Sequence, residues 1–353
     1  MKVLMAGGGT LGSVTPLLAV AEELKFSRPD IIVEWVGTSF GPERKLVQTY
    51  GIKFTAITCG RWRRYFSLQN IFDLFKIVVG FMAALAYLIN SRPQALVTAG
   101  SYVAVPLAWA AWVLRVPILV HQQDLRIGLA NKLVLPFAKT VTAAWPDIAK
   151  HLAGRNAPVI GNPVRRQIMA PVDKIQTLKK LGWPQDKPVV LVMGGGTGAE
   201  FINTLLIKNL TPLTSLARII HITGDNKSAA WPQSDYQSFP LAINEVASFF
   251  QLADLVITRA GMGTMAELSA LGKPAIIIPI PRSHQEVNAE FVKSHGAAVV
   301  LNQLDLDNDK FVAAVNDLLR NHGKLSELSG KIDTLMPKDA ARQMADLILK
   351  LMA

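Results

Sequence analysis

Two stretches of the chain carry the same succession of apolar run, glycine-rich turn and helix start. The first is an apolar run over residues 2–6, the turn GGGTLGS over residues 7–13, and Pro16, a residue that favours the first helical turn. The second is Val189–Met193 followed by GGGTGA over residues 194–199. A buried strand that leads through such a turn into a helix opens a Rossmann-like unit. The chain is therefore predicted to contain two Rossmann-like halves.

Further segments agree with an α/β fold built on doubly wound parallel sheets. Additional apolar runs lie at residues 31–36, 54–57, 95–98 and 117–120. The 353 residues suffice for two domains. We place an N-terminal domain at residues 1–160 and a C-terminal domain at 161–336, because Gly161 and Pro163 interrupt both periodicities. Residues 337–353 are predicted to form a helix that packs back towards the N-terminal domain.

Residues 253–289 combine a strand, a glycine-containing turn, a helix, a second strand and a polar loop. The turn at 259–264 leads directly into the helix, whose first N–H groups suit a diphosphate. Glu267, one turn into the helix, is placed to accept hydrogen bonds from a ribose diol. The loop adds neutral groups that suit sugar hydroxyls, namely His284, Gln285 and Asn288. The alternative is an ordinary βαβ unit whose glycines only form a tight turn.

The charge balance favours an anionic partner. The chain has 37 basic and 26 acidic residues and a formal charge of +11, which suits a nucleic acid, a nucleotide or a membrane surface. Its one cysteine, Cys59, excludes an internal disulfide and fits a reducing compartment. The apolar run at the N-terminus meets the glycine turn too early for a signal peptide, so we expect a cytoplasmic protein.

Residues 60–89 combine a basic, aromatic segment with a long apolar stretch. The predicted membrane patch consists of Arg61, Trp62, Arg63, Arg64 and Phe66. Only residues 77–89 lack charge, which is too short to span a bilayer. One interpretation is an interfacial patch on anionic lipid; the other is a core helix preceded by a solvated basic loop. No nucleic-acid module accompanies the cluster, so we expect no nucleic-acid partner.

Two motifs support rival functions. Gly7, Gly9 and Gly12 match the dinucleotide fingerprint, with Glu34 near the position of its ribose-binding acid, which suggests an NAD-dependent dehydrogenase. However, Glu34 lies in the middle of a predicted strand. The sequence Asp-Leu-Asp at 305–307 matches a metal motif of sugar transferases, yet it precedes a helix that it would cap. No histidine–cysteine cluster has metal-ligand spacing, so neither a metal nor a cofactor is predicted.

Several motifs in a fixed order resemble the MurG family of GT-B glycosyltransferases over nearly the full length. They are AGGGTLGSVTPLLAVAEEL at the N-terminus, WVGT at 35–38, YVAVP at 102–106, VHQQD and LANK within 120–132, GNPVR at 161–165, MGGGTGAEFIN at 193–203, and the stretch 253–289. The resemblance implies two Rossmann-like domains across a cleft. It also implies inverting, metal-independent transfer of N-acetylglucosamine from UDP-N-acetylglucosamine to undecaprenyl-linked muramyl-pentapeptide. The expected location is the cytoplasmic face of the membrane, as a peripheral protein on an anionic surface.

The resemblance also implies a set of donor contacts. They are Thr10, Leu11, Gly12, Asp124, Arg165, Gly195, Gly196, Ile243, Met262, Gly263, Thr264, Met265, Ala266, Glu267 and Gln285. Among these, Arg165 matches an arginine that helps to hold the donor, and Ile243 matches a residue that packs by the uracil.

The chain departs from the family pattern near the expected catalytic centre. Ser13 stands where the family usually has histidine, Gln122 where it has glutamate, and Gly196 where it has serine. Further departures are Ser101 and Val105, where glycine is usual. The catalytic candidates are Asp124 and Ser13, although a serine alone is no base near neutral pH. Another lipid-directed GT-B enzyme, acting on diacylglycerol, and a binding module without catalysis remain alternatives.

Overall fold

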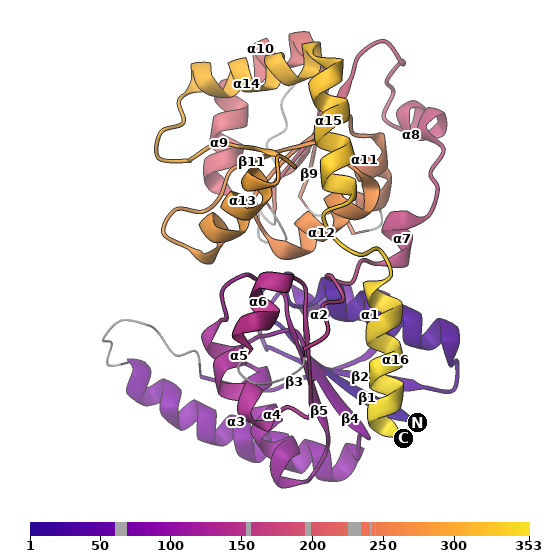
Figure 1. The fold of residues 1–353 in the computed structure, drawn as a ribbon, viewed down its shortest axis with the longest axis vertical. Helices are drawn as coiled ribbons and strands as arrows, with labels where there is room; N and C mark the ends of the chain where they lie inside the picture. Colours follow the sequence, from indigo (N-terminus) through magenta and orange to yellow (C-terminus); the bar gives the residue numbers. More distant parts are fainter. Residues whose placement is uncertain (61–68, 153–156, 195–198, 225–233, 241, 244) are drawn as a thin grey trace. The chain divides into compact units, whose positions relative to one another are not determined.

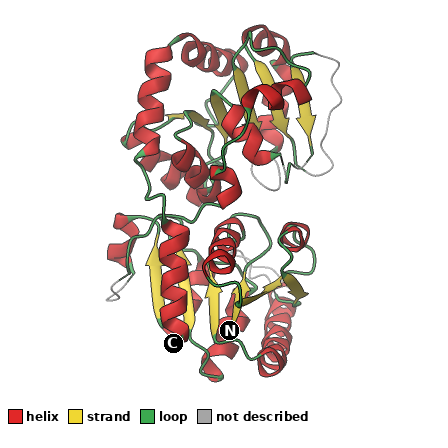
Figure 2. Ribbon diagram, turned by 90° about the vertical axis from the view of Figure 1, so that its right-hand side faces the viewer, coloured by secondary structure: helices red, strands yellow, loops and turns green. Residues whose placement is uncertain are grey.

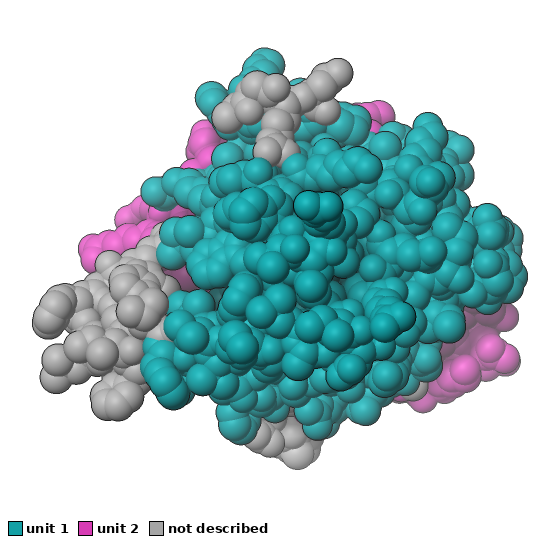
Figure 3. Space-filling view, turned by 90° about the horizontal axis from the view of Figure 1, so that it is seen from below, with its two compact units in different colours: residues 1–165, 338–353 teal, residues 166–337 magenta. Residues whose placement is uncertain are grey.

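The chain forms two compact units. The computed structural model spans residues 1–353 and describes all of them except 61–68, 153–156, 195–198, 225–233, 241 and 244. Unit 1 contains residues 1–165 and 338–353, and unit 2 contains residues 166–337 (Figure 3). The divisions between the units fall after residues 165 and 337, whereas the sequence analysis placed the domain boundaries after residues 160 and 336.

Unit 1 is built on six parallel strands in the order β3-β2-β1-β4-β5-β6. The strands are β1 (Lys2–Ala6), β2 (Ile32–Gly37), β3 (Lys53–Ala56), β4 (Ala95–Thr98), β5 (Ile118–Gln122) and β6 (Thr140–Ala143). In β1, Met5 pairs with Trp35 of β2 and with Val97 of β4. Helices cover both faces of the sheet, which explains why its central strands are continuous apolar runs (Figure 2).

The helices of unit 1 include one from the far end of the chain. They are α1 (Thr15–Ser27), α2 (Glu43–Thr49), α3 (Gln69–Ser91), α4 (Ala104–Val113), α5 (Leu129–Val134), the short 3-10 helix η1 (Leu135–Phe137), α6 (Pro146–His151) and α16 (Ala340–Met352). Helix α16 packs against α1 and β4 (Figure 1). Its buried positions, such as Met344, Ile348 and Leu351, recur at helical spacing and explain this packing.

Unit 2 repeats the architecture with the strand order β12-β11-β10-β7-β8-β9. The strands are β7 (Val189–Met193), β8 (Arg218–Ile222), β9 (Tyr236–Phe239), β10 (Leu255–Thr258), β11 (Ala275–Ile277) and β12 (Val299–Val300). The helices are α7 (Arg166–Met169), α8 (Lys174–Lys180), α9 (Glu200–Lys208), α10 (Leu210–Leu216), α11 (Val246–Leu252), α12 (Met262–Leu271), α13 (His284–Ser294), α14 (Asn308–Arg320) and α15 (His322–Asp333). The predicted pair of doubly wound parallel sheets is thus confirmed.

Each sheet has one point at which the strand order reverses. Strands that follow one another in sequence run outwards from β1 or β7 on one side, and the chain then returns to add β4 or β10 on the other side. In open parallel sheets, ligands bind outside the carboxyl ends of the strands at this switch point. The fold therefore directs attention to the loops after β1 and β4 in unit 1, and after β7 and β10 in unit 2.

The segment after β11 corrects the sequence analysis. We expected a polar loop there, but His284, Gln285 and Asn288 lie in helix α13. Ser283 caps this helix by accepting a hydrogen bond from the backbone N–H of Gln285, and Glu286 lies in its first turn. Both features favour a helix start and were visible in the sequence.

Candidate functional site

Part of the predicted donor site follows β7 and β10, which are neighbours at the switch point of unit 2. Gly195 and Gly196 follow β7 and fall outside the described residues. The described part of the site is therefore the turn after β10 together with α12.

Among the described residues, no side chain caps the start of α12, as is also the case for helices such as α1, α4 and α11. Its N-cap is Gly261, no side chain accepts a hydrogen bond there, and the first turn has no acidic residue. Helices α13 and α14 begin instead at Ser283 and Asp307, whose side chains accept hydrogen bonds from backbone N–H groups. Because the first N–H groups of a helix carry partial positive charge, an uncapped start suits an anionic group such as a diphosphate.

The predicted contact residues of α12 differ in exposure. Gly263 and Thr264 are half-buried at the helix start. The other predicted positions are buried, namely Met262, Met265, Ala266 and Glu267. The side chains of Met265 and Ala266 belong to the core, so these two positions offer a ligand only their backbone.

Helix α13 is tied to the turn that precedes α12. The side-chain amide of Asn288 donates a hydrogen bond to the carbonyl of Ala260 at 3.2 Å. Gln285, in the first turn of α13, is half-buried and accepts a hydrogen bond from the backbone N–H of Ile280 at 3.2 Å. Ile243, the predicted uracil contact, is half-buried shortly before α11. These contacts fix the polar end of α13 relative to the turn before α12.

Arg259, the first residue after β10, carries a buried guanidinium. Its Nη1 atom donates to the carbonyls of Ile278 at 2.9 Å and Pro279 at 3.2 Å, and to Oε1 of Gln303 at 2.7 Å. The guanidinium lies over the ring of Phe201, 5.9 Å from its centroid. Burial lowers the pKa of Arg259 from its ordinary value. Within the described residues it has no ion pair with a carboxylate.

A buried histidine orients the helix that follows β7. His221 of β8 shares hydrogen bonds with Oδ1 of Asn203 at 3.0 Å and with the Tyr236 hydroxyl at 2.9 Å. The Asn203 amide also donates to the carbonyl of Thr223 at 2.9 Å. Burial lowers the pKa of His221 to about 4, so the ring is neutral near pH 7. Asn203 lies on α9, so this neutral network anchors α9 to β8 and β9.

In unit 1, the glycine turn after β1 is held by three other segments. The carboxylate of Glu43 accepts hydrogen bonds from the backbone N–H groups of Gly9 at 3.2 Å and Thr38 at 2.7 Å. The Trp35 ring nitrogen donates to the carbonyl of Gly7 at 2.9 Å. The hydroxyl of Ser101 donates to the carbonyl of Gly8, also at 2.9 Å.

This packing explains why the turn requires glycine. A Cβ atom on Gly8 would lie 2.2 Å from the Glu43 carboxylate, and Gly9 has a positive φ of 82°. The turn continues into the predicted donor and catalytic positions, of which Thr10 and Gly12 are exposed and Leu11 and Ser13 are half-buried.

The end of β5 holds a polar network next to Asp124. The side-chain amide of Gln122 donates to the carbonyl of Asp124 at 2.7 Å, while its oxygen accepts from Asn131 at 2.6 Å. The amide performs both roles, whereas an ionised glutamate at this position could accept but not donate. Asp124 itself is half-buried.

His121, next to Gln122 in β5, connects this region to β6 and to the segment around Asn162. Its ring shares hydrogen bonds with Thr142 at 2.9 Å and Asn162 at 3.1 Å, and burial lowers its pKa to about 4. Arg165, three residues after Asn162 in the sequence, is buried.

The ribose-binding role suggested for Glu34 is not supported by its surroundings. Glu34 is buried in β2 and accepts hydrogen bonds from the hydroxyl of Tyr87 at 2.9 Å and the amine of Lys53 at 3.2 Å. Ser91 donates a further hydrogen bond to the same carboxylate. These contacts bind α3 and β3 to β2, so the carboxylate has a structural role.

The Asp-Leu-Asp motif also has a structural role. Asp307 is the N-cap of α14, and its Oδ1 atom accepts a hydrogen bond from the backbone N–H of Lys310 at 2.8 Å. This hydrogen bond lowers the pKa of the Asp307 carboxyl. Across the described ranges, no group of three or more histidine, cysteine, aspartate or glutamate side chains is placed to hold a metal ion.

Comparison with known proteins connects both halves of the chain to one family. Residues 3–143 match the glycosyltransferase family 28 N-terminal domain, and residues 189–344 match its C-terminal domain. A Clostridium botulinum relative is 35% identical over 326 residues, or 91% of each chain, and a Legionella pneumophila relative is 33% identical over 354 residues, or 98% of this chain and 96% of its own. Both are called UDP-N-acetylglucosamine–N-acetylmuramyl-(pentapeptide) pyrophosphoryl-undecaprenol N-acetylglucosamine transferase. The chain belongs to the MurG family.

Solved structures agree with the MurG assignment. The crystal structure of Acinetobacter baumannii MurG has a TM-score of 0.72 and 26% identity, with 99% of both chains covered. A UDP complex of Staphylococcus aureus MnaA, at 15% identity and a TM-score of 0.72, shares the fold. The predicted GT-B fold and the predicted glycosyltransferase class are confirmed by these comparisons.

Against the MurG pattern, two departures now have a structural account. Ser101 uses its hydroxyl to hold the first glycine turn, and Gln122 uses its amide to shape the loop that carries Asp124. Ser13, at the position of the family histidine, is half-buried in the first turn. The predicted patch Arg61, Trp62, Arg63, Arg64 and Phe66 lies outside the described residues.

Sequence reasoning missed three residues of these loops. Glu43 was given no role, although its carboxylate holds the first glycine turn. His121 was given no role, and Arg259 was treated only as the first residue of a turn. For His121 and Arg259, a polar side chain at or just after an apolar strand was the available signal, because such a residue must satisfy its polar atoms near the sheet edge.

Proposed function

We propose that this chain transfers N-acetylglucosamine from UDP-N-acetylglucosamine to the lipid-linked muramyl-pentapeptide, the step named in its relatives. The uncapped start of α12, at the switch point of a MurG-family chain, is the observation that carries the proposal. A transfer assay with the two substrates tests it. Transfer to diacylglycerol instead would favour the other lipid-directed reaction, and binding of donor without transfer would indicate a module that has lost catalysis.

The proposed reaction is a direct displacement with inversion. The acceptor hydroxyl attacks the anomeric carbon, the new C–O bond forms, and the bond between that carbon and the diphosphate oxygen breaks. Negative charge then increases on the departing UDP. N–H groups at Gly263 and Thr264, the amides of Gly195 and Gly196, and the guanidinium of Arg165 would stabilise this charge in place of a metal ion.

The proposed base is Asp124. It would take the proton of the acceptor hydroxyl as that oxygen attacks. Its half-buried position at the end of β5 leaves it accessible, and the Gln122 amide fixes the backbone beside it. Ser13 would assist by hydrogen bonding rather than as a base.

The proposed site of membrane attachment is a face of α3 together with the end of α4. Apolar side chains recur along α3 at helical spacing but point to solvent, with Phe75 70% and Met82 60% exposed. Trp112, at the end of α4, is 56% exposed, and α3 packs against α4. A solvent-facing apolar stripe suits insertion at the headgroup level. No described helix has the length and hydropathy needed to cross a bilayer.

Vesicle binding tests the attachment site. Replacing Arg61, Arg63 and Arg64 together should weaken binding to anionic vesicles and reduce its salt dependence. Replacing Phe75 and Met82 with serine should weaken binding at every salt concentration, because apolar contact is not screened. Equal binding of the unmodified chain to neutral and anionic vesicles would contradict the role of the arginines.

A further inference from the structure

Arg259 is a buried cation whose described hydrogen-bond partners are all uncharged. The residue is 7% exposed, and its three hydrogen-bond acceptors are two backbone carbonyls and the amide oxygen of Gln303, all neutral. Its Nε atom is buried and has no hydrogen-bond partner in the part of the chain that the structure describes. Among the described residues, no carboxylate forms an ion pair with it.

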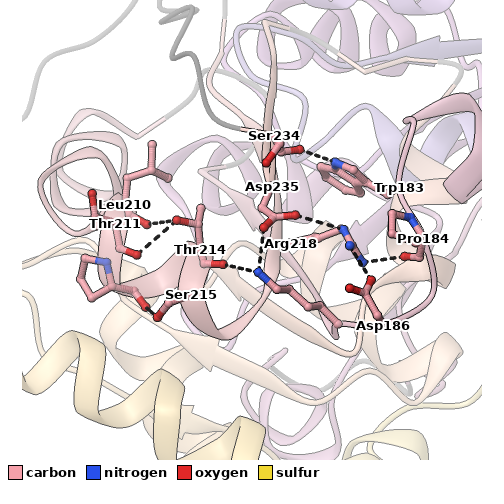
Figure 4. Close-up of polar contacts among 12 residues, drawn as sticks. Trp183, Pro184, Asp186, Leu210, Thr211, Thr214, Ser215, Arg218, Ser234 and Asp235 are labelled. Carbon is pink, nitrogen blue, oxygen red and sulfur yellow. Dashed lines mark hydrogen bonds and ion pairs between the residues drawn. The ribbon is translucent and has the colours of Figure 1, made fainter.

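Such an arrangement is costly in the empty protein. A buried charge is ordinarily paired, because transfer from water to the interior removes its hydration. Arg218, the other buried arginine of unit 2 described here, follows this rule: it forms ion pairs with Asp186 and Asp235 (Figure 4). Arg259 lacks this compensation, so its surroundings have a positive potential that an anion would reduce.

The position of Arg259 places this potential at the proposed donor site. The residue follows directly after β10 at the switch point, and Gly261, two residues later in the sequence, is the uncapped start of α12. Its guanidinium donates to the carbonyls of Ile278 and Pro279, directly after β11. The charge therefore lies along the carboxyl edge of the sheet. The helix dipole and the buried cation therefore favour an anion at the same edge.

We propose that Arg259 determines specificity for the diphosphate of the donor, by supplying an uncompensated buried charge rather than by contacting the sugar or base. This inference rests on the proposed function. Affinity should then depend on the charge of the ligand, with the effect of Arg259 largest for UDP, smaller for UMP and absent for uridine.

Calorimetric titration of UDP, UMP and uridine tests the inference on the full chain, with variants R259Q and R259K. R259Q should bind UDP roughly ten- to hundredfold more weakly, as expected for one unit charge at about 8 Å in an effective dielectric constant of about 20. Its affinity for uridine should change less than about twofold, which also shows that the site is folded. R259K keeps the charge but not the hydrogen-bond geometry, and should retain the preference for UDP over uridine. The exposed Arg320 of the same unit provides the matched control, R320Q, which alters net charge equally and should bind like the unmodified chain.

The outcomes separate charge from scaffolding. Equal loss of UDP and uridine binding in R259Q, or loss of the UDP preference in R259K, would show that Arg259 only supports the loop, and would overturn the inference. If R259Q does not fold, R259K alone decides, because retained preference supports the role of charge and lost preference refutes it. If the unmodified chain binds no UDP, the proposed function itself fails. If it binds UDP and R259Q binds equally well, only this inference fails.

Discussion

The two edges of the unit 2 sheet treat a buried arginine in opposite ways. At the amino edge, Arg218 begins β8 and is enclosed by carboxylates: its Nε atom lies 3.2 Å from Asp235, and Lys187 lies 2.7 Å from the other oxygen of that aspartate. Asp186 completes the pairing (Figure 4). At the carboxyl edge, Arg259 follows β10 and meets only neutral acceptors.

This difference indicates that the two edges of one sheet have different roles, one in stability and the other in ligand binding. The charges at the amino edge pair with one another, which suits a structural role. At the carboxyl edge, the start of α12 and Arg259 provide positive potential, and no described carboxylate forms an ion pair with Arg259, which suits an anionic ligand. Substitutions at the amino edge should therefore alter stability, and those at the carboxyl edge should alter binding and turnover.

The largest effect on stability is expected at Arg218. R218Q leaves Asp235 partly buried with Lys187 as its one remaining ion-pair partner among the described residues, and should lower the free energy of unfolding by about 2–4 kcal/mol. Urea unfolding measures this, with R320Q as the control. UDP affinity measured below the unfolding transition should stay within about twofold of the unmodified chain. A large loss of UDP affinity in a folded R218Q would contradict the assignment of stability to the amino edge and of ligand binding to the carboxyl edge.

The largest effect on turnover is expected at Asp124. D124N removes the proposed base while keeping the size of the side chain, and should lower kcat by about a hundredfold or more, with little change in donor binding. Steady-state transfer kinetics and UDP titration measure the two quantities separately. Unchanged kcat would exclude Asp124 as the base, and the carboxyl edge of unit 1 would then need another candidate.

Glu43 sharpens the comparison, because it is a buried acid at the carboxyl edge of unit 1. All described donors to its carboxylate are N–H or O–H groups, so in E43Q the amide would face another donor. We expect a loss of about 1–3 kcal/mol in stability, measured by urea unfolding. UDP affinity should not change beyond about twofold, because Glu43 holds the glycine turn after β1 and not the start of α12 that is proposed to bind the diphosphate. Unaltered stability would show that the glycine turn does not depend on Glu43.

The smallest effect is expected on the stability of the protein at acidic pH. The hydrogen bond from Arg218 holds the pKa of the Asp186 carboxyl below its ordinary value. A depressed native pKa contributes stability that is present above the unfolded-state value near 4 and is lost as pH falls through the native value. The pH dependence of stability below about pH 4 should therefore be shallower in D186N than in the unmodified chain. If stability depends on pH in the same way in D186N and in the unmodified chain, Asp186 does not contribute to the acid sensitivity.

Much of the fold could be read from local signals. The apolar runs at 2–6 and 189–193 predicted β1 and β7, because strands buried on both faces carry no alternating polar residues. Gly9 and Pro16 indicated the turn and the start of α1 through their own backbone preferences. The exposure of the apolar face of α3 could not be predicted from the sequence, since its composition fits a core helix as well as a membrane-facing one.

The sequence by itself determined the two strand–turn–helix repeats, the family and the uncapped start of α12, because each depends on residues that are close together in the chain or on motifs in order. Tertiary structure alone decided how Glu43, His121 and Arg259 are used. Their partners Gly9, Asn162 and Gln303 lie 34, 41 and 44 residues away, respectively. Whether a buried polar side chain is neutralised, hydrogen-bonded or left charged depends on such distant partners, since pairing requires atoms that only the folded sheet brings within reach.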